Sequence, residues 1–264
     1  MALVTVDFFA KSLKRTVSFQ ALIPGDTPGL FGHEAQERGP LKSLYLLHGY
    51  SGNSSDWMTF TNIRELSDKH RIAVFMPSGE NHFYLDDSDL GACYGEFIGK
   101  ELVEYTREMF HISCDRDDTF IGGLSMGGYG AIRNGLKYAE QFGKIIALSS
   151  AILPYRIAGV SKDYSDGVSD YKYLTRVFGD LNQLKGSDKD PEALIIGLKE
   201  TNRKIPDLYI ACGTEDFLLD VNRKFHEFLA AEKVKFSYLE SAGAHTWEFW
   251  REKIEEAILW ATED

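Results

Sequence analysis

Long apolar runs are missing from the sequence. No stretch of its 264 residues approaches the roughly 20 consecutive apolar residues of a membrane-spanning helix. The first segment, Met1–Ser12, has no basic start and carries Asp7 inside its apolar part, so it is not typical of a secretory signal peptide. We therefore expect a soluble, cytoplasmic protein with no membrane span.

Cysteine is scarce, and the three that occur are Cys93, Cys114 and Cys212. An odd number of cysteines cannot all pair, and their spacing does not match a metal-ligand pattern. We expect free thiols of a reducing compartment, with neither a disulfide framework nor a metal site.

Positive charge is also in short supply. Lys and Arg total 29 against 40 Asp and Glu, which gives a formal net charge of −11. Such a chain repels phosphate backbones, so we do not expect nucleic acid as a partner. Hydrophobic residues at 44% and charged residues at 26% are ordinary for a globular protein and exclude intrinsic disorder.

The apolar runs that are present have two characters. Val4–Phe9 and Thr16–Ile23 are β-branched and aromatic with partial alternation, which predicts antiparallel strands at the start of a sheet. Later runs are short and continuously apolar, as in strands buried on both faces of a parallel sheet. These runs are Ser43–Leu47, Ile72–Met76, Thr119–Ile121, Lys144–Leu148, Leu208–Cys212 and Lys235–Leu239.

Segments with helical spacing lie between the later runs. They are Trp57–His70, which follows the cap-like Ser-Ser-Asp at 54–56, then Gly95–Phe110, Gly127–Phe142, Leu219–Glu232 and Trp247–Ala261. Alternating strands and helices predict one α/β domain over residues 1–264, with a mostly parallel central sheet flanked by helices. Such sheets bind ligands at the carboxyl ends of their strands.

Two segments depart from this alternation. Residues 24–40, from Pro24 to Pro40, contain three Pro and four Gly and predict a surface loop. The stretch Ala151–Lys204 is long, polar and rich in Tyr and Asp. Because long connections in compact domains are usually functional, we interpret it as a modest cap insertion at about residues 151–205.

The strongest chemical motif is Gly123-Leu124-Ser125-Met126-Gly127, the one G-x-S-x-G pattern in the chain. A strand-like run precedes it and a helix-like run follows it, which is the context of a nucleophile elbow. The turn would project the Ser125 hydroxyl above the sheet, next to a helix N-terminus that favours negative charge. The alternative is a glycine-rich turn with a passive serine.

A serine nucleophile needs a base and an acid, which follow it in the order acid, then histidine. Only His226 and His245 follow Ser125 in the chain. His226 sits in a helical run, whereas His245 lies on a small-residue loop after a predicted strand, so His245 is our candidate base. Its alternative role is that of an ordinary surface-loop histidine.

The candidate acid is Asp216, which follows the strand-like run Leu208–Cys212. Glu215 and Asp220 are rival candidates, the first displaced by one residue and the second at the start of the next helix. Asp216 could instead form an Asx turn or cap that helix.

The oxyanion of acyl transfer requires backbone donors. We expect one from the Met126 amide in the elbow and a second from the Tyr50 amide, with Ser51 as the alternative. His48 in the same loop is expected to organise the loop and to take no part in proton transfer.

Several motifs give the chain a resemblance to the α/β-hydrolase superfamily and, within it, to the esterase D-like family. They are Leu47–Gly52, Asn81–Asp86, Glu101-Leu102, Gly123–Gly130, Gly213–Asp216 and Gly243–Trp247. That family includes tributyrin esterases of lactic-acid bacteria and streptococci, which the chain resembles most, and S-formylglutathione hydrolases. The resemblance implies an α/β-hydrolase fold, short-chain carboxylesterase activity, no cofactor, and a dimer or tetramer. It also implies a triad of Ser125, Asp216 and His245, and oxyanion donors at Tyr50 and Met126.

The leading functional hypothesis is therefore a serine carboxylesterase acting on small acyl esters through an acyl-enzyme. The alternative enzyme is a thioesterase of the S-formylglutathione type, but that branch typically reads Ser-Gly-Leu-Thr-Cys where this chain has His48–Gly52, which favours simple esters. A catalytically dead hydrolase used as a binding module is disfavoured by the complete triad. Metal-dependent hydrolysis is disfavoured because the sequence has no cluster with ligand spacing.

Aromatic residues near these motifs are candidates for the substrate pocket. They are Trp57, Phe83, Tyr84 and Trp247, and each could equally be a core residue.

Overall fold

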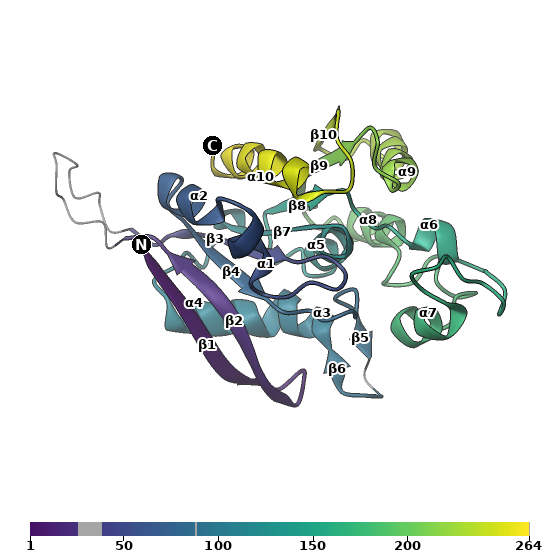
Figure 1. The fold of residues 1–264 in the computed structure, drawn as a ribbon, viewed down its shortest axis with the longest axis horizontal. Helices are drawn as coiled ribbons and strands as arrows, with labels where there is room; N and C mark the ends of the chain where they lie inside the picture. The colour runs from purple at the N-terminus through teal and green to yellow at the C-terminus, as the bar shows by residue number, and fades with distance from the viewer. Residues whose placement is uncertain (26–38, 88, 264) are drawn as a thin grey trace.

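The structure is a computed structural model that describes residues 1–25, 39–87 and 89–263 (Figure 1). Most of the surface loop predicted between Pro24 and Pro40 lies outside the described residues. The three cysteines are free thiols, and burial raises the pKa of Cys212 to about 12. Among the described residues, no helix combines the length and the apolar character that crossing a bilayer requires.

An eight-stranded sheet in the order β1-β2-β4-β3-β7-β8-β9-β10 forms the centre of the molecule. Its strands are β1 (Ala2–Ala10), β2 (Arg15–Ile23), β3 (Lys42–Leu47), β4 (Ile72–Pro77), β7 (Thr119–Leu124), β8 (Lys144–Leu148), β9 (Asp207–Gly213) and β10 (Phe236–Ser241). β2 is antiparallel to both neighbours, and all pairings from β4 to β10 are parallel. The predicted antiparallel start and parallel remainder are confirmed. A separate small sheet pairs β5 (Asp86–Asp87) with β6 (Ala92–Cys93).

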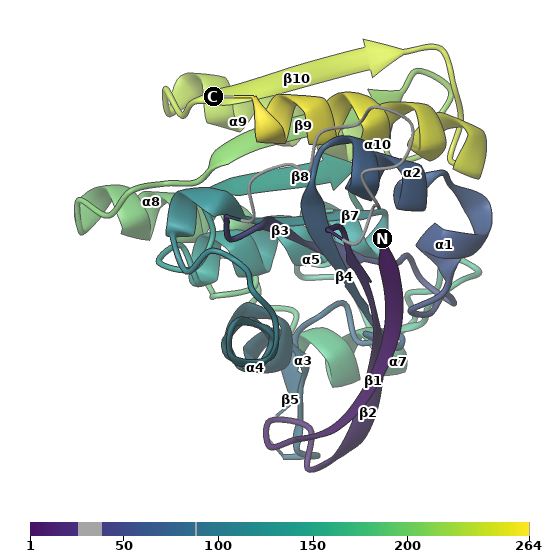
Figure 2. The ribbon, with the colours of Figure 1, turned by 90° about the vertical axis from the view of Figure 1, so that its left-hand side faces the viewer.

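Helices cover both faces of the sheet, as Figure 2 shows. They are α1 (Asp56–Phe60), α2 (Ile63–Lys69), α3 (Tyr94–Glu96), α4 (Leu102–Met109), α5 (Met126–Lys137), α6 (Pro154–Ile157), α7 (Tyr171–Phe178), α8 (Pro191–Glu200), α9 (Leu219–Ala231) and α10 (Trp247–Thr262). A π-helical turn, Phe97–Glu101, joins α3 to α4, and a 3₁₀ turn, Arg116–Asp118, precedes β7.

Two apolar cores lie on opposite faces of the sheet, because successive side chains of a strand point to opposite sides. In β3, Tyr45 and Leu47 pack into the core under α4, α5 and α9, while Leu44 and Leu46 pack into the core under α1, α2 and α10. The central strands β3, β4, β7, β8 and β9 are therefore buried on both faces, which explains their continuously apolar sequences, whereas exposed residues alternate along β1.

The helix predicted over Trp57–His70 is wrong in one respect, because it is divided into α1 and α2. Thr61 between them is extended, with φ −133° and ψ 174°. The Ser55 side chain does not cap α1. Instead, the Asn53 side chain accepts hydrogen bonds from the Ser55 amide and hydroxyl. The helix predicted over Gly127–Phe142 ends early, at Lys137.

The predicted cap falls in the connection between β8 and β9, which carries α6, α7 and α8. A fully buried arginine of α5, Arg133, ties this connection to the body of the protein. Its Nε donates to the Asp188 carbonyl at 3.1 Å, and its guanidinium pairs with the Asp188 carboxylate and, at 3.5 Å, with Asp86. A buried charge is tolerated only with such partners, so the connection is anchored at Asp188.

Candidate active site

The turn between β7 and α5 holds Ser125 in an unusual backbone conformation, with φ 53° and ψ −117°. A positive φ is costly for a residue with a side chain and persists only where the surroundings impose it. Here the Ser125 amide donates to the Leu148 carbonyl at 2.9 Å, and the Ser125 carbonyl accepts from the Ala151 amide at 2.9 Å. The neighbouring strand β8 and its exit therefore fix the turn.

Two glycines allow the strand and the helix to cross closely at this turn. A Cβ atom added to Gly123 would lie 2.5 Å from the Gly127 carbonyl oxygen, and one added to Gly127 would lie 2.5 Å from the Leu47 carbonyl oxygen. Both distances are far shorter than real Cβ contacts allow, so the G-x-S-x-G pattern is a steric requirement of this turn.

We expect Gly127→Ala to lower the free energy of unfolding by roughly 1–3 kcal/mol, the usual cost of overpacking. Gly197→Ala is a matched control, because Gly197 lies within α8 with no atom within 4 Å of its added Cβ. A mid-helix alanine there should be stabilising by roughly 0.4–1 kcal/mol. Denaturant unfolding of both variants measures the difference, and equal stabilities would contradict the steric argument.

His245 lies on the loop between β10 and α10 and connects two other side chains. Its Nε2 is 3.0 Å from Ser125 Oγ, and its Nδ1 is 2.8 Å from Asp216 Oδ2. The rings of Phe217 and Trp250 pack against the imidazole, with centroids 4.6 and 4.8 Å away. The three side chains selected from the sequence thus lie within hydrogen-bond distance of one another.

The Asp216 carboxylate is buried at the start of the loop after β9. Burial alone would raise its pKa, but hydrogen bonds from His245, the Leu218 amide and the Ser149 hydroxyl outweigh this and lower the pKa below its usual value. The Leu218 amide donates at 2.8 Å. Asp216 is therefore held ionised next to the imidazole, where it favours a proton on Nδ1.

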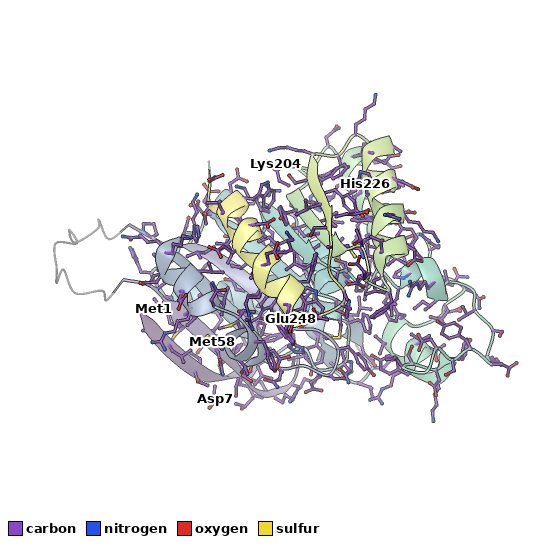
Figure 3. All side chains as sticks on the ribbon, turned by 45° about the horizontal axis from the view of Figure 1, so that its top comes forward. Met1, Asp7, Met58, Lys204, His226 and Glu248 are labelled. Carbon is purple, nitrogen blue, oxygen red and sulfur yellow. The ribbon has the colours of Figure 1, made fainter. Side chains whose placement is uncertain are left out.

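The rival residues lie elsewhere. Glu215 accepts hydrogen bonds from Thr214 Oγ1 at 2.7 Å and from the Gly243 amide at 2.6 Å, so it supports the loop that carries His245. Asp220 pairs with Arg156 of α6. Figure 3 shows His226 on α9, well apart from Glu248 at the start of α10, which lines the cavity at Ser125.

The loop after β3 lies beside the serine turn and supplies amide donors. Within the described ranges, the Tyr50 and Met126 amides donate to no other protein group, whereas the Ser51 amide donates to Asn81 Oδ1 at 2.8 Å. Ser51 is therefore already engaged, which leaves Tyr50 and Met126 as the free donors.

His48 is buried and joined to backbone groups on both sides. Its Nδ1 lies 2.7 Å from the Gly49 carbonyl oxygen, and its Nε2 accepts from the Gly79 amide at 2.9 Å. This pattern requires the neutral ring with the proton on Nδ1. Burial lowers the pKa of His48, which also favours the neutral ring. The arrangement agrees with the predicted role of His48 in organising the loop.

A cavity of about 790 Å³ opens over Ser125 and His245. The connection between β8 and β9 contributes Ala151, Leu153, Arg156, Asp166, Val168, Ser169 and Tyr173 to its wall. Two of the four candidate pocket aromatics, Phe83 and Trp247, also lie in the wall, together with Phe60, whose ring stacks on Trp247 with centroids 4.9 Å apart. The wall mixes apolar and charged groups.

Two predicted pocket residues are core residues instead. Trp57 is buried beneath the loop after β3 and donates from Nε1 to the Leu47 carbonyl at 3.0 Å. Tyr84 is buried and donates its hydroxyl to the His48 carbonyl at 3.0 Å. Neither belongs to the cavity wall among the described residues. Sequence reasoning missed Phe217 and Arg156, which carry no motif to mark them.

Sheets of this strand order carry their nucleophile on the turn after the central strand β7, and this arrangement places the protein in the α/β-hydrolase fold class. The family model described as "Putative esterase" matches residues 11–261. The chain therefore belongs to this esterase family and is a carboxylic ester hydrolase of the serine type.

Individual relatives agree with this assignment. An acetyl esterase of Caldicellulosiruptor saccharolyticus is 49% identical over 260 residues, which cover 98% of each chain. Among solved structures, the fluorophosphonate-binding serine hydrolase FphF of Staphylococcus aureus, in a substrate-bound form, is 28% identical with a TM-score of 0.85, covering 100% of this chain and 99% of that one. The S-formylglutathione hydrolase FrmB of the same organism is 28% identical with a TM-score of 0.83, covering 99% of both chains.

Proposed function

We propose that the protein hydrolyses esters of short acyl chains by covalent catalysis through Ser125, His245 and Asp216. The observation that carries this proposal is the position of the His245 ring, with Nε2 at 3.0 Å from Ser125 Oγ and Nδ1 at 2.8 Å from Asp216 Oδ2. A hydroxyl is a weak nucleophile near neutral pH, and this geometry supplies the base that it needs.

In the first half of the reaction, Ser125 Oγ attacks the ester carbonyl while His245 Nε2 takes the hydroxyl proton. The amides of Tyr50 and Met126 stabilise the oxyanion that forms. His245 then returns the proton to the departing alcohol, which leaves an acyl-enzyme. Water activated by His245 releases the acid in the second half, and Asp216 stays ionised throughout and stabilises the imidazolium.

Two observations support a short acyl group. The relative that is 49% identical is named an acetyl esterase. The connection between β8 and β9 also contributes Arg156, Asp166 and Ser169 to the cavity wall, so its part of the wall is not a continuous apolar trench. A long acyl chain gains from such a trench by roughly 0.8 kcal/mol for each buried methylene.

We expect kcat/KM for p-nitrophenyl esters to be highest at about two to four acyl carbons and to fall steeply beyond about eight, because methylenes added beside Arg156, Asp166 and Ser169 gain little from burial. Acetate, butyrate, octanoate and palmitate esters, assayed below any micelle threshold, provide the series. Ser125→Ala supplies the background rate. A maximum at octanoate or palmitate would contradict the short-acyl specificity.

A thioesterase activity is the second candidate, favoured by the similarity to the S. aureus S-formylglutathione hydrolase. Acetyl oxyesters and acetyl thioesters whose leaving groups differ only in the oxygen or sulfur atom separate the esterase from the thioesterase. A kcat/KM that is higher for S-formylglutathione than for every simple ester would replace the esterase proposal with the thioesterase.

A further inference from the structure

The loop between β4 and β5 is held in a strained conformation beside the oxyanion donors. Glu80, Phe83 and Tyr84 all have positive φ, at 47°, 51° and 55°. The Asn134 side chain donates to the Tyr84 carbonyl at 3.0 Å, and the Tyr84 hydroxyl donates to the His48 carbonyl. The loop is therefore anchored to α5 and to the loop after β3, and it presents Asn81 at a fixed position.

Asn81 accepts two hydrogen bonds, one on its side chain and one on its backbone carbonyl. Its side-chain Oδ1 accepts from the Ser51 amide at 2.8 Å. Its backbone carbonyl accepts from the Tyr173 hydroxyl at 2.6 Å. Asn81 thus joins Ser51, the residue after Tyr50, to α7 in the connection between β8 and β9, which we call the cap connection.

These contacts restrict the direction of the Tyr50 amide. A peptide unit is planar, so the Tyr50 N–H points away from the Gly49 carbonyl of the same unit. That carbonyl bonds to His48 Nδ1 at 2.7 Å and accepts from the Gly52 amide at 3.1 Å. Asn81 holds the next peptide unit through the Ser51 amide, so both peptide units that flank the Tyr50 α-carbon are fixed.

The backbone conformation of Ser51 shows why its amide needs a hydrogen-bond acceptor. Its φ is 65°, a left-handed conformation that costs about 1–3 kcal/mol in a residue with a side chain. Without the Asn81 acceptor, the peptide unit between Tyr50 and Ser51 can rotate toward a relaxed conformation and carry the Tyr50 amide with it. The Ser51 amide would also be free to compete for the oxyanion.

Tyr173 adds a contact from the cap side. Its ring meets the Tyr50 ring edge-on, with centroids 6.0 Å apart and planes at 86°. The bond from its hydroxyl to Asn81 and this ring contact both hold the Tyr50 segment against α7. The cap connection therefore supports the oxyanion donors through these two residues.

We propose that Asn81 is a positioning residue for ester hydrolysis, which orients the Tyr50 amide toward the oxyanion, and that Tyr173 holds Asn81 in place from the cap. This inference rests on the proposed function, because it assumes that the Tyr50 amide binds the oxyanion. Asn81 touches neither the Ser125 nor the His245 side chain in the hydrogen bonds of the site, so it acts through the loop after β3.

The first test compares Asn81→Ala with Asn53→Ala. Both asparagines accept a backbone amide of the same loop at 2.8 Å, but Asn53 serves Ser55 at the start of α1. Complete loss of an oxyanion donor costs about 10²–10³ in kcat, so a misdirected donor should cost roughly 10- to 100-fold. We expect this loss for Asn81→Ala with KM changed less than about twofold, and a kcat within about twofold of wild type for Asn53→Ala.

A transition-state probe separates positioning from a merely structural role. The compound 1,1,1-trifluoro-2-butanone forms a serine adduct that carries an oxyanion, so its inhibition constant should rise in Asn81→Ala by the same factor by which kcat falls. Thermal unfolding of each variant accompanies the assay. A wild-type kcat and a wild-type inhibition constant in folded Asn81→Ala would overturn the proposal.

A double-mutant cycle tests the role of Tyr173. Tyr173→Phe keeps the ring against Tyr50 and removes the bonds of the Tyr173 hydroxyl to the Asn81 backbone carbonyl and to the Tyr50 side chain, so it should lower kcat severalfold. In the Asn81→Ala background it should lower kcat by a smaller factor than in the wild-type background, because the part of its effect that runs through the Asn81 side chain is already lost. Independent, multiplicative losses would contradict the link through Asn81.

The activities of Ser125→Ala and Asn81→Ala distinguish a failure of the proposed function from a failure of the role given to Asn81. If Ser125→Ala kept its activity, the proposed mechanism itself would fail. If Ser125→Ala were inactive and Asn81→Ala behaved like wild type, only the role of Asn81 would be refuted.

Discussion

Replacement of Ser125 by alanine is expected to lower kcat for p-nitrophenyl butyrate by about 10⁶, the cost of losing the nucleophile of such a triad. In the proposed mechanism Ser125 Oγ is the atom that bonds to the acyl carbon, and no other group in the described part of the site replaces it. The change removes one oxygen from a turn that backbone contacts hold in place, since Leu148 and Ala151 bond to the Ser125 amide and carbonyl. The fold should therefore survive.

Circular dichroism and thermal unfolding check that the variant is folded. A fluorophosphonate should label the wild-type protein once, at Ser125, and should leave Ser125→Ala unlabelled. The buried Cys212 thiol is no competitor, because burial raises its pKa to about 12 and keeps it protonated. Activity within tenfold of wild type, or a label on another residue, would remove Ser125 from the mechanism.

The second large effect is expected for Asp216→Asn, which should lower kcat by up to about 10⁴. The ionised Asp216 accepts a hydrogen bond from the Nδ1–H group of His245 at 2.8 Å and so leaves Nε2 free to accept the proton of Ser125. An asparagine amide can donate to Nδ1, which favours the tautomer with the proton on Nε2. That tautomer cannot act as a base toward Ser125.

Glu215→Gln is the matched control for Asp216→Asn. It makes the same chemical change one residue away, and its amide oxygen can still accept from the Gly243 amide as Glu215 does at 2.6 Å. We expect a kcat within about threefold of wild type, since an exposed hydrogen bond of this kind contributes little. A larger loss in Glu215→Gln than in Asp216→Asn would make Glu215 the partner of His245.

Much of the fold follows from local patterns in the sequence. The continuously apolar runs are strands because a parallel sheet buries both faces, as Tyr45 and Leu44 show on opposite sides of β3. The serine turn was predictable because its two glycines are required by contacts shorter than any Cβ allows. The proximity of His245 and Asp216 was predictable because both follow parallel strands, whose carboxyl ends meet at one edge of the sheet.

Other features depend on contacts that no local pattern records. Trp57 and Tyr84 resemble pocket aromatics in sequence, yet their polar atoms bond to the backbone of Leu47 and His48 and their rings are buried. The break between α1 and α2 arises where Thr61 takes an extended conformation, without a proline or glycine to announce it. Asn81 acquires its contacts only through a loop with three left-handed residues, which the sequence does not specify in advance.

The anchoring of the β8–β9 connection also bears on how substrate range can evolve in this protein. Since β8 and β9 are adjacent and parallel, the chain leaves the sheet at the carboxyl end of β8 and re-enters it at the opposite edge, where Asp207 of β9 pairs with Lys144 of β8. The entropic cost of closing such a crossover grows only slowly with its length. A different segment could be inherited here as a unit while the serine turn and the loops bearing Asp216 and His245 stay unchanged. The constraint on such an exchange is Arg133, whose buried guanidinium would lose the Asp188 carboxylate and keep Asp86, at 3.5 Å, as its charged partner among the described residues. A successful replacement therefore has to bring an acceptor to the same point.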